Sequence, residues 1–438
     1  MKRFVRPGAF LLLAALLFCL SGCYSGNIDQ YFSLPMASEE YRQLQSLIDE
    51  ELASGSEYAA PIHGSYRQSV QLSDVDGDGA DEALAFFRDA AKNPKINIYD
   101  SENGEHRLAL SISGEGSSIG RIDYADLTGD GQKELLVSWQ ISSGLSVLGV
   151  YSLAGWSGDV LLSTDSAEFV TGDINRDGCD ELLNLRAANS TTYLVDQYTF
   201  PLGQEPQATS AALSAGISAL QRLRMVTLAG DAPALLAEST LTTGDLVSDL
   251  FVCRDGSLIN LTMNRTTQIS ETCRSYSLVY AQDIDGDGST EIPHPQQLYS
   301  RGDEVFWSIA WFRYDASGRA STIMTTYHCV TDNWYLVLPS GWDVGLTVRR
   351  DDSVSGERAV ILSRLRSDGS LEDYAAVYAI TGENRYERAR LDNRFLLQEE
   401  GTTVYAAKIL DGKTDENTIR SRFHVIYTDW SSGSVVGG

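Results

Sequence analysis

Histidine and cysteine are scarce in this sequence, and their scarcity limits the available chemistry. Among 438 residues there are five histidines and six cysteines. The histidines are scattered and form no HExxH pattern or other metal-ligand spacing, and the spacings of the cysteines are unlike those of a zinc site. The sequence therefore gives no indication of a zinc centre.

Positive charge is also scarce. The chain has 34 lysines and arginines against 60 aspartates and glutamates, a formal net charge of −26. Such an excess of negative charge repels phosphate backbones and anionic lipid surfaces. We therefore expect no nucleic-acid partner.

Long apolar runs are absent after the N-terminus. The run from Ala9 to Leu20 follows the basic residues Lys2, Arg3 and Arg6. It is too short to span a bilayer as a stable helix, and no later stretch approaches the roughly 18 apolar residues that a span needs. We expect residues 1–22 to be a signal peptide, whose removal takes away three positive charges and changes the formal charge from −26 to −29.

The apolar run ends in Leu20-Ser21-Gly22-Cys23. This order resembles the lipobox of bacterial lipoproteins, in which the cysteine is acylated and becomes the first residue of the mature chain. The resemblance implies lipidation at Cys23 and a place on the extracytoplasmic face of the cell membrane, held by the N-terminal lipid. The alternative is an ordinary secretory signal followed by an unrelated cysteine.

Four cysteines remain beyond Cys19 and Cys23, and export would allow them to form disulfides. Cys253 and Cys273 could join neighbouring strands, but free thiols are equally consistent with the sequence. The cysteines whose redox state stays open are Cys179, Cys253, Cys273 and Cys329.

An acidic nine-residue motif occurs four times. The copies read DVDGDGADE from Asp74, DLTGDGQKE from Asp126, DINRDGCDE from Asp173 and DIDGDGSTE from Asp283. The intervals between them are 52, 47 and 110 residues, and the last is close to twice the others. Met225 to Glu238 keeps the apolar flanks but loses most of the acidic residues, so we interpret it as a fifth, degenerate copy.

A period near 50 residues predicts a repeat architecture, in which each unit buries its apolar face against the next. Short apolar bursts flank the motifs, such as Val70 to Leu72 and Ala83 to Phe87, and they are typical of β-strands. Several strands per repeat predict a mainly β fold, a β-propeller of about five repeats. Helices are expected only near Tyr41 to Ile48, behind a cap at Ser38, and around Ala211 to Arg224.

The acidic motif stops recurring after about residue 325. We therefore expect a signal peptide at 1–22, a lipidated cysteine with linker and short helix at 23–64, propeller repeats at 65–324, and a small α+β domain at 325–438. The alternative is that the C-terminal part forms two more blades of a seven-bladed propeller.

The composition of the motif predicts Ca²⁺ binding. Carboxylates at positions 1, 3, 5 and 9 can converge only if the chain coils tightly, and the glycine at position 6 permits that turn. Hard oxygen donors in a loose geometry suit Ca²⁺ better than Mg²⁺. The expected ligands, for up to four Ca²⁺ ions, are Asp74, Asp76, Asp78, Glu82; Asp126, Thr128, Asp130, Glu134; Asp173, Asn175, Asp177, Glu181; and Asp283, Asp285, Asp287, Glu291. Because Thr128 lacks a carboxylate, we expect the second loop to be the weakest.

An EF-hand also needs an acidic residue at position 12. Here the residues at that position are Ala85, Val137, Asn184 and His294. The motif instead resembles the FG-GAP or VCBS-type calcium loop of integrin α-subunit propellers, over roughly residues 65–320. Together with the lipobox, it makes the chain similar to VCBS-repeat lipoproteins of Gram-positive bacteria, for which the resemblance implies a surface location but no chemistry.

The sequence offers little for catalysis. Gly116 to Gly120 matches GxSxG, but the following residues predict a strand, whereas a nucleophile elbow needs a helix there. We therefore expect no enzyme, but a calcium-binding scaffold for a protein or cell-wall glycan partner. The alternatives are a propeller-based polysaccharide lyase or glycosidase, and a structural spacer.

Overall fold

The computed structural model describes residues 39–102, 105–300 and 303–426. The expected signal peptide and Cys23 lie outside these residues. The described chain is mainly β, as the sequence predicts, with short helices at α3 (Glu39–Ala53), α4 (Arg385–Arg388) and α5 (Glu416–Arg420). None of the helices in the described ranges is long and apolar enough to cross a bilayer.

The first helix packs against the first sheet. Leu44 and Ile48 of α3 are buried and contact Phe87 and Tyr99. Leu47 is partly buried beside them, whereas Tyr41 is exposed. The predicted helix with one apolar face is therefore confirmed. Tyr41 lies in the helix but is not part of its buried face.

The strands form consecutive antiparallel sheets, and most strands pair with their neighbours in sequence. The first sheet contains β1 (Glu57–Tyr58), β2 (Val70–Ser73), β3 (Glu82–Arg88), β4 (Pro94–Glu102) and β5 (Glu105–Ser113). The second contains β6 (Ser118–Ala125), β7 (Glu134–Ser142), β8 (Leu145–Tyr151) and β9 (Val160–Ser166). The third contains β10 (Glu168–Gly172), β11 (Glu181–Ala187), β12 (Tyr193–Thr199) and β13 (Gln207–Ala212).

Three further sheets complete the described chain. The fourth contains β14 (Ile217–Leu228), β15 (Ala232–Leu241), β16 (Leu246–Arg254) and β17 (Ser257–Asn260), and a small hairpin of β18 (Met263–Asn264) and β19 (Ile269–Ser270) follows it. The fifth contains β20 (Glu291–Gln297), β21 (Trp307–Tyr314), β22 (Ala320–Cys329), β23 (Trp334–Val337) and β29 (Phe423–Val425). The sixth contains β24 (Leu346–Asp351), β25 (Glu357–Leu365), β26 (Leu371–Ile380), β27 (Phe395–Glu400) and β28 (Thr403–Ile409).

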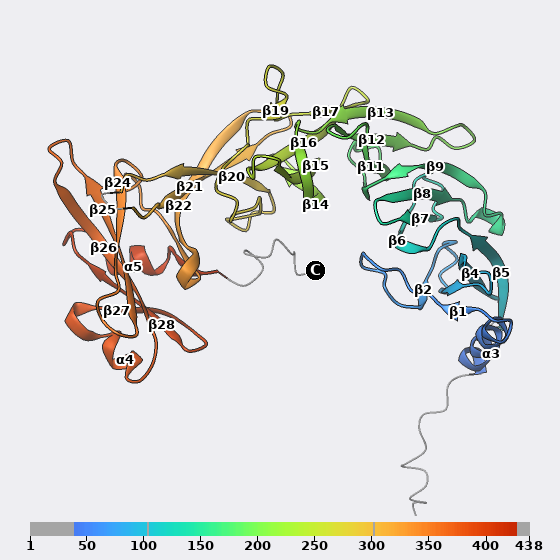
Figure 1. Ribbon diagram of the computed structural model, residues 1–438, viewed down its shortest axis with the longest axis horizontal. Coiled ribbons are helices and arrows are strands. Elements are labelled where there is room, and N and C mark those ends of the chain that lie inside the picture. The colour runs from blue at the N-terminus through green and yellow to red at the C-terminus, as the bar shows by residue number, and fades with distance from the viewer. Residues whose placement is uncertain (1–38, 103–104, 301–302, 427–438) are drawn as a thin grey trace, which may run out of the picture.

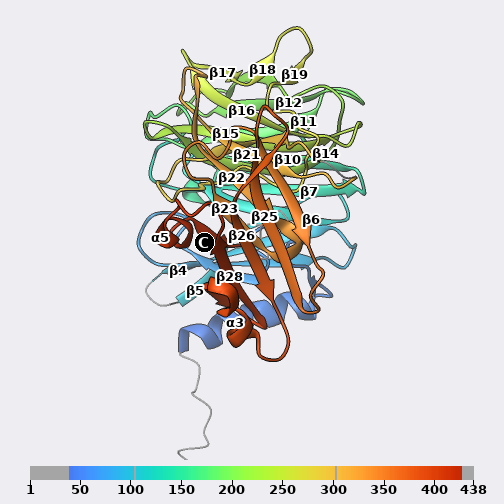
Figure 2. The same ribbon diagram turned by 90° about the vertical axis from the view of Figure 1, so that its left-hand side faces the viewer.

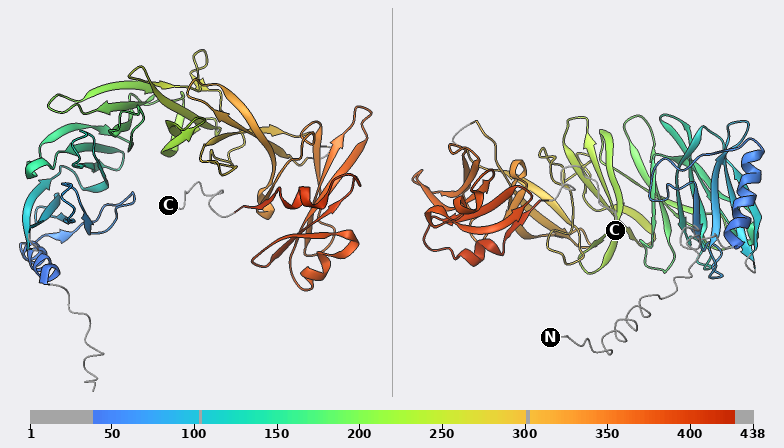
Figure 3. Two further views of the ribbon diagram at one scale, coloured as in Figure 1. Left: turned by 180° about the vertical axis from the view of Figure 1, so that it is seen from behind. Right: turned by 90° about the horizontal axis from the view of Figure 1, so that it is seen from below.

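The sheets follow one another along an open arc (Figure 1). Helix α3 and the first sheet lie at one end and the sixth sheet at the other, so the arc does not close into a ring. The first strands β2, β6 and β14 lie on the inner side, and the last strands β5, β9 and β13 on the outer side. Seen from below, the sheets stand in a row (Figure 3), and the sixth sheet lies in front of the others in the view of Figure 2.

The helix expected around Ala211 to Arg224 is wrong. These residues belong to β13, to β14 and to the short connection between them. The apolar spacing of Leu213, Ile217 and Leu220 fits a helix equally well, but β14 pairs along most of its length with β15. This tertiary pairing overrides a weak local preference for helix.

The C-terminal part shares strands and core with the fifth sheet. The expected boundary between residues 324 and 325 falls inside β22, and β29 returns to pair with β23. One core cluster includes Trp334 and Leu336 of β23 together with Val377 and Tyr405 of the sixth sheet. Residues 325–426 hold the end of the fifth sheet, the whole sixth sheet and the short helices α4 and α5.

The acidic loops occupy equivalent places. In the first three sheets the loop joins β2 to β3, β6 to β7 and β10 to β11. The fourth motif directly precedes β20, where Gln282 and Glu291 form a bridge. In the fourth sheet a short turn at residues 229–231 joins β14 to β15, in the place of the expected degenerate copy.

Candidate metal centre

The first acidic loop coils because two glycines adopt the left-handed conformation. Gly77 and Gly79 have φ values of 80° and 91°, which residues with a Cβ rarely adopt. The coil lets Asp74 accept hydrogen bonds from the backbone N–H groups of both glycines, at 2.8 and 3.2 Å. The loop is thus held by the first aspartate of its own motif.

All four loops share this hydrogen-bond pattern. In the other three, the first aspartate likewise accepts from the N–H groups at positions 4 and 6, and these aspartates are Asp126, Asp173 and Asp283. The glutamate at position 9, the closing glutamate, accepts a hydrogen bond from the backbone N–H of position 2 at 2.8 to 3.1 Å. The closing glutamates are Glu82, Glu134, Glu181 and Glu291. Four segments of different sequence therefore adopt one conformation.

The residue at position 2 ties each loop to the sheets. Val75, Leu127 and Ile174 are buried, and Ile284 packs partly buried against the core of the fifth sheet. Because position 2 also donates its N–H to the closing glutamate, burial of its side chain fixes that carboxylate in place.

The first loop gathers the largest group of carboxylates. Oxygens of Asp74, Asp76 and Asp78 lie within 4.8 Å of one another, and so do oxygens of Asp76, Glu82 and Asp100. Asp100 lies on β4, outside the motif, and was not anticipated from the sequence. One of its oxygens accepts a hydrogen bond from Arg107 at 2.8 Å.

The closing glutamate of the first loop has an oxygen without a donor. The side chain of Glu82 is fully buried, and its Oε1 is a buried oxygen that no hydrogen-bond donor reaches. A buried, unpaired carboxylate oxygen is unfavourable unless a cation or a proton satisfies it. The first loop therefore fits a cation that the protein itself does not supply.

The fourth loop contains its own cation. Asp283, Asp285 and Glu291 converge within 4.8 Å. The guanidinium of Arg313, from β21, lies 2.8 Å from oxygens of Asp285, Asp287 and Glu291. Arg313 thus contacts three of the four expected ligands and offsets part of their negative charge.

The second and third loops replace the carboxylate at position 3 with a hydrogen-bond donor. Thr128 Oγ1 donates to Glu134 Oε1 at 3.4 Å. The amide of Asn175 donates to both Asp177 and Glu181. Among the described residues, the carboxylates of these two loops form no group of three within 4.8 Å.

Burial raises the pKa of the closing glutamates. For Glu82, Glu134 and Glu181 the pKa rises to about 7, mainly because of burial and further because of the neighbouring aspartates. The pKa of Glu291 is also raised by burial, but a hydrogen bond from Arg313 opposes the shift. A positive charge in the loop therefore stabilises the ionised glutamate.

Neighbouring loops contact one another through their backbones. The N–H of Lys133 in the second loop donates to the carbonyl of Val75 in the first at 2.9 Å, and Lys133 Nζ donates to the carbonyl of Asp74 at 2.8 Å. The N–H of Asp180 in the third loop donates to the carbonyl of Asp126 in the second at 3.3 Å. The first three loops therefore form a continuous stack along one edge of the sheets.

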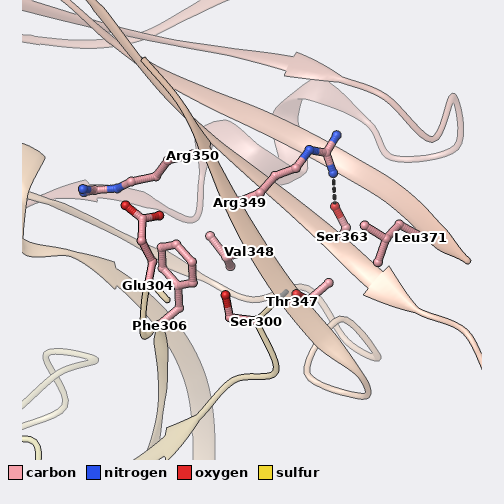
Figure 4. A pocket seen from close by; sticks show the side chains of 9 residues that line it. All are labelled: Ser300, Glu304, Phe306, Thr347, Val348, Arg349, Arg350, Ser363 and Leu371. Carbon is pink, nitrogen blue, oxygen red and sulfur yellow. Dashed lines mark hydrogen bonds between the residues drawn. The ribbon is translucent and has the colours of Figure 1, made fainter. Parts of the chain in front are cut away.

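A cavity of about 230 Å³ lies beside β24, between the fifth and sixth sheets. Figure 4 shows that Arg349 and Arg350 point to opposite sides of the strand and that Glu304 is the one carboxylate in its lining. Arg349 donates hydrogen bonds to Asp373 and Ser363. A glycosidase or lyase needs paired carboxylates in a cleft, and this cavity does not bring such a pair together.

The cysteines in the described residues are free thiols. They are Cys179, Cys253, Cys273 and Cys329. The suggested disulfide between Cys253 and Cys273 is therefore not formed in this structure.

Comparisons with known proteins identify no family. No family model matches the chain, and no curated protein matches it. Among solved structures, one match is a Bacteroides uniformis protein provisionally named a 6-phosphogluconolactonase. It is 13% identical, the match covers 68% of this chain and 82% of that one, and the TM-score is 0.26. A likeness this distant carries no conclusion about fold or activity.

Proposed function

We propose that this chain is a lipid-anchored, extracytoplasmic calcium-binding scaffold that presents a rigid row of β-sheets to a protein or cell-wall glycan. The sheets would be the blades of an FG-GAP-like propeller, with their first strands on the inner side of the arc. The anchor would be a lipid on Cys23, which would leave the described residues outside the cytoplasm. The protein would have no catalytic activity of its own.

The observation that carries this proposal is the buried Oε1 of Glu82. It lies among carboxylates, and no hydrogen-bond donor reaches it. Asp74, Asp76 and Asp78 offer further oxygens to the same region. A set made only of oxygen donors is the set that Ca²⁺ prefers, whereas Mg²⁺ requires a smaller and more regular cage.

Calcium would act mainly on stability. Extracellular modules of this kind bind Ca²⁺ with Kd values of roughly 10⁻⁴ to 10⁻³ M. At ten times its Kd, one site adds about 1.4 kcal/mol to the free energy of unfolding. Since the loops stack on one another, ions at neighbouring loops would also rigidify the row of sheets.

The test is thermal unfolding of the mature chain in EDTA, in Ca²⁺ and in Mg²⁺. We expect Tm to fall reversibly by several degrees in EDTA, and Ca²⁺ but not Mg²⁺ to restore it. The variant Asp76→Ala should lose most of the response to Ca²⁺. Asp368→Asn, which alters an exposed acidic turn between β25 and β26, should keep it.

Equal melting curves of the wild-type chain in EDTA and Ca²⁺ would reject the proposal. An enzymatic alternative receives no support from the cavity at β24, and the spacer alternative predicts the same calcium response without a partner. The two non-catalytic functions are separated by binding of the mature chain to purified cell wall, which a pure spacer would not show.

A further inference from the structure

One position outside the motifs differs sharply between the sheets. It faces the closing glutamate from the next strand along the chain. In the fifth sheet, Glu291 of β20 pairs in register with Arg313 of β21. In the first sheet, Ala83 pairs with Tyr99, so Glu82 faces Asp100 one residue further on.

The same position is neutral in the second and third sheets. Leu135 pairs with Tyr151, and continuing that register by one residue places Ser152 opposite Glu134. Leu182 pairs with Tyr198, which likewise places Thr199 opposite Glu181. The residue facing the closing glutamate is thus an aspartate in the first sheet, a serine or threonine in the second and third, and an arginine in the fifth. The acidic loops beside these residues nevertheless share one backbone conformation.

The donors to Oε1 of the closing glutamate also differ between the loops, and they come from the facing residue in the fifth sheet and from position 3 of the motif in the second and third. Glu291 Oε1 accepts from Arg313 Nε at 2.8 Å, and the corresponding oxygens of Glu134 and Glu181 accept from Thr128 and Asn175. In the first sheet Glu82 Oε1 has no donor, and Asp100 adds a further carboxylate beside it. The first loop thus lacks the internal donor that each of the other loops has.

We propose that, in the first and fourth loops, the residue facing the closing glutamate determines whether the loop takes up a divalent cation. Asp100 is a further ligand that makes the first loop the principal site, and Arg313 replaces the ion in the fourth loop. This inference rests on the proposed calcium binding and sharpens it, because the four similar motifs then differ in ion uptake. The fourth loop is held together in the absence of calcium.

The charges around the first and fourth loops favour this division. In the first loop the five carboxylates, including Asp100, have two cations nearby. Arg107, whose side chain is largely exposed, contacts Asp100, and Lys133 Nζ contacts the backbone carbonyl of Asp74. In the fourth loop one guanidinium contacts three carboxylates from a side chain that is mostly covered. A divalent ion entering the fourth loop would have to displace that guanidinium, whereas the first loop needs no such displacement.

The test is calorimetric titration of the mature chain with CaCl₂, comparing Asp100→Asn and Arg313→Gln with matched controls. The control for Asp100→Asn is Asp196→Asn, since Asp196 is also buried on a strand and paired with an arginine, Arg186. The control for Arg313→Gln is Arg349→Gln, which removes an arginine from a strand carboxylate, Asp373, far from the loops.

We expect Asp100→Asn to weaken the tightest site by about tenfold, because calcium affinity follows the number of charged ligands. Arg313→Gln should gain one bound calcium ion per chain. Both controls should bind as the wild type does. Should Arg313→Gln unfold in EDTA, its refolding by Ca²⁺ but not by Mg²⁺ would support the exchange, and failure to refold at any calcium concentration would overturn it.

The outcomes distinguish failure of this inference from failure of the proposed calcium binding on which it rests. A wild-type chain that binds no calcium overturns both. A wild-type chain that binds calcium, with Asp100→Asn and Arg313→Gln unchanged in affinity and in number of ions, overturns the inference alone.

Discussion

Gly77 of the first loop lies against the backbone of Gly131 of the second. A Cβ added to Gly77 would lie 2.8 Å from the carbonyl oxygen of Gly131, closer than real Cβ contacts. By contrast, a Cβ added to Gly79, two residues further on, would meet no atom within 4 Å. Both glycines have positive φ, so an alanine at either position causes the same kind of backbone strain. Only an alanine at position 77 would also disturb the contact between the two loops.

We predict that Gly77→Ala destabilises the chain more than Gly79→Ala does. Each substitution should cost about 1–2 kcal/mol for placing a Cβ in the left-handed region. Gly77→Ala should cost at least about 1 kcal/mol more, since the added methyl group forces the two loops apart. Urea unfolding of both variants measures the difference, and equal midpoints would show that the loops do not depend on this contact.

The fourth sheet, which lacks an acidic loop, depends on a buried ion pair. Arg274 Nη2 lies 3.1 Å from Glu238 Oε1, and both side chains are almost completely buried. Arg222 Nη1 lies 3.6 Å from the other oxygen of Glu238, so Arg274→Met would leave the glutamate one longer ion pair, and we predict a loss of about 3 kcal/mol. The control is Arg366→Met, which breaks an exposed pair with Glu372 and should cost at most about 1 kcal/mol. Similar denaturation midpoints for the two variants would contradict the role of the buried pair.

His328 should make the protein sensitive to mild acid. It lies buried between Trp311 and Tyr335 in the fifth sheet, and burial lowers its pKa from 6.5 to about 3. The imidazole of His328 therefore binds a proton below about pH 6.5 in the unfolded chain, but only near pH 3 in the folded chain. Stability due to this histidine is thus complete above pH 6.5 and is lost as the pH falls towards 3.

We predict that His328→Gln reduces this acid sensitivity. Between pH 7.5 and 5, the wild type should lose about 2 kcal/mol more than the variant, at roughly 1.4 kcal/mol per pH unit below the unfolded pKa. Urea unfolding at the two pH values measures it, with the exposed His63→Gln as control. A pH dependence of His328→Gln that matches the wild type would refute the assignment.

Lipidation at Cys23 gives a further prediction. When the full chain is expressed in a bacterium, we expect the protein in the membrane fraction, and its N-terminal peptide should carry acyl chains on Cys23. Cys23→Ser should move the protein out of that fraction while leaving its melting temperature unchanged, because every residue of the described sheets is kept. Mass spectrometry of an unmodified N-terminal peptide from the wild type would contradict the lipobox assignment.

The sequence alone predicted those features that local chemistry determines. The spacing of Leu44 and Ile48 was sufficient for the first helix, and the glycine at position 6 for the coiled loops. The strand from Ala83 to Phe87 followed from its continuous apolar run. In each case the physical cause lies within a few residues of the feature.

What the sequence did not predict depends on strand register. Asp100 lies 18 residues beyond Glu82 and Arg313 lies 22 beyond Glu291, and nothing in the motifs points to either residue. The turn at Asp89 to Asn93 could have indicated the register of the first pair, since it fixes which residues of β3 and β4 face each other. The open arc likewise depends on how whole sheets pack, which no local pattern encodes.

Direct measurement of bound calcium tests the central claim, that the acidic loops hold this ion. Equilibrium dialysis of the mature chain against about 1 mM Ca²⁺, near the upper end of the expected Kd range, should show calcium bound in excess of the buffer. Glu82→Gln should lose about 0.5 to 0.9 bound ions per chain, the occupancy of one site at this concentration, while Glu372→Gln, altering an acid outside the loops, should match the wild type. A wild-type chain that retains no calcium, or a Glu82→Gln variant that retains as much as the wild type, would contradict the claim.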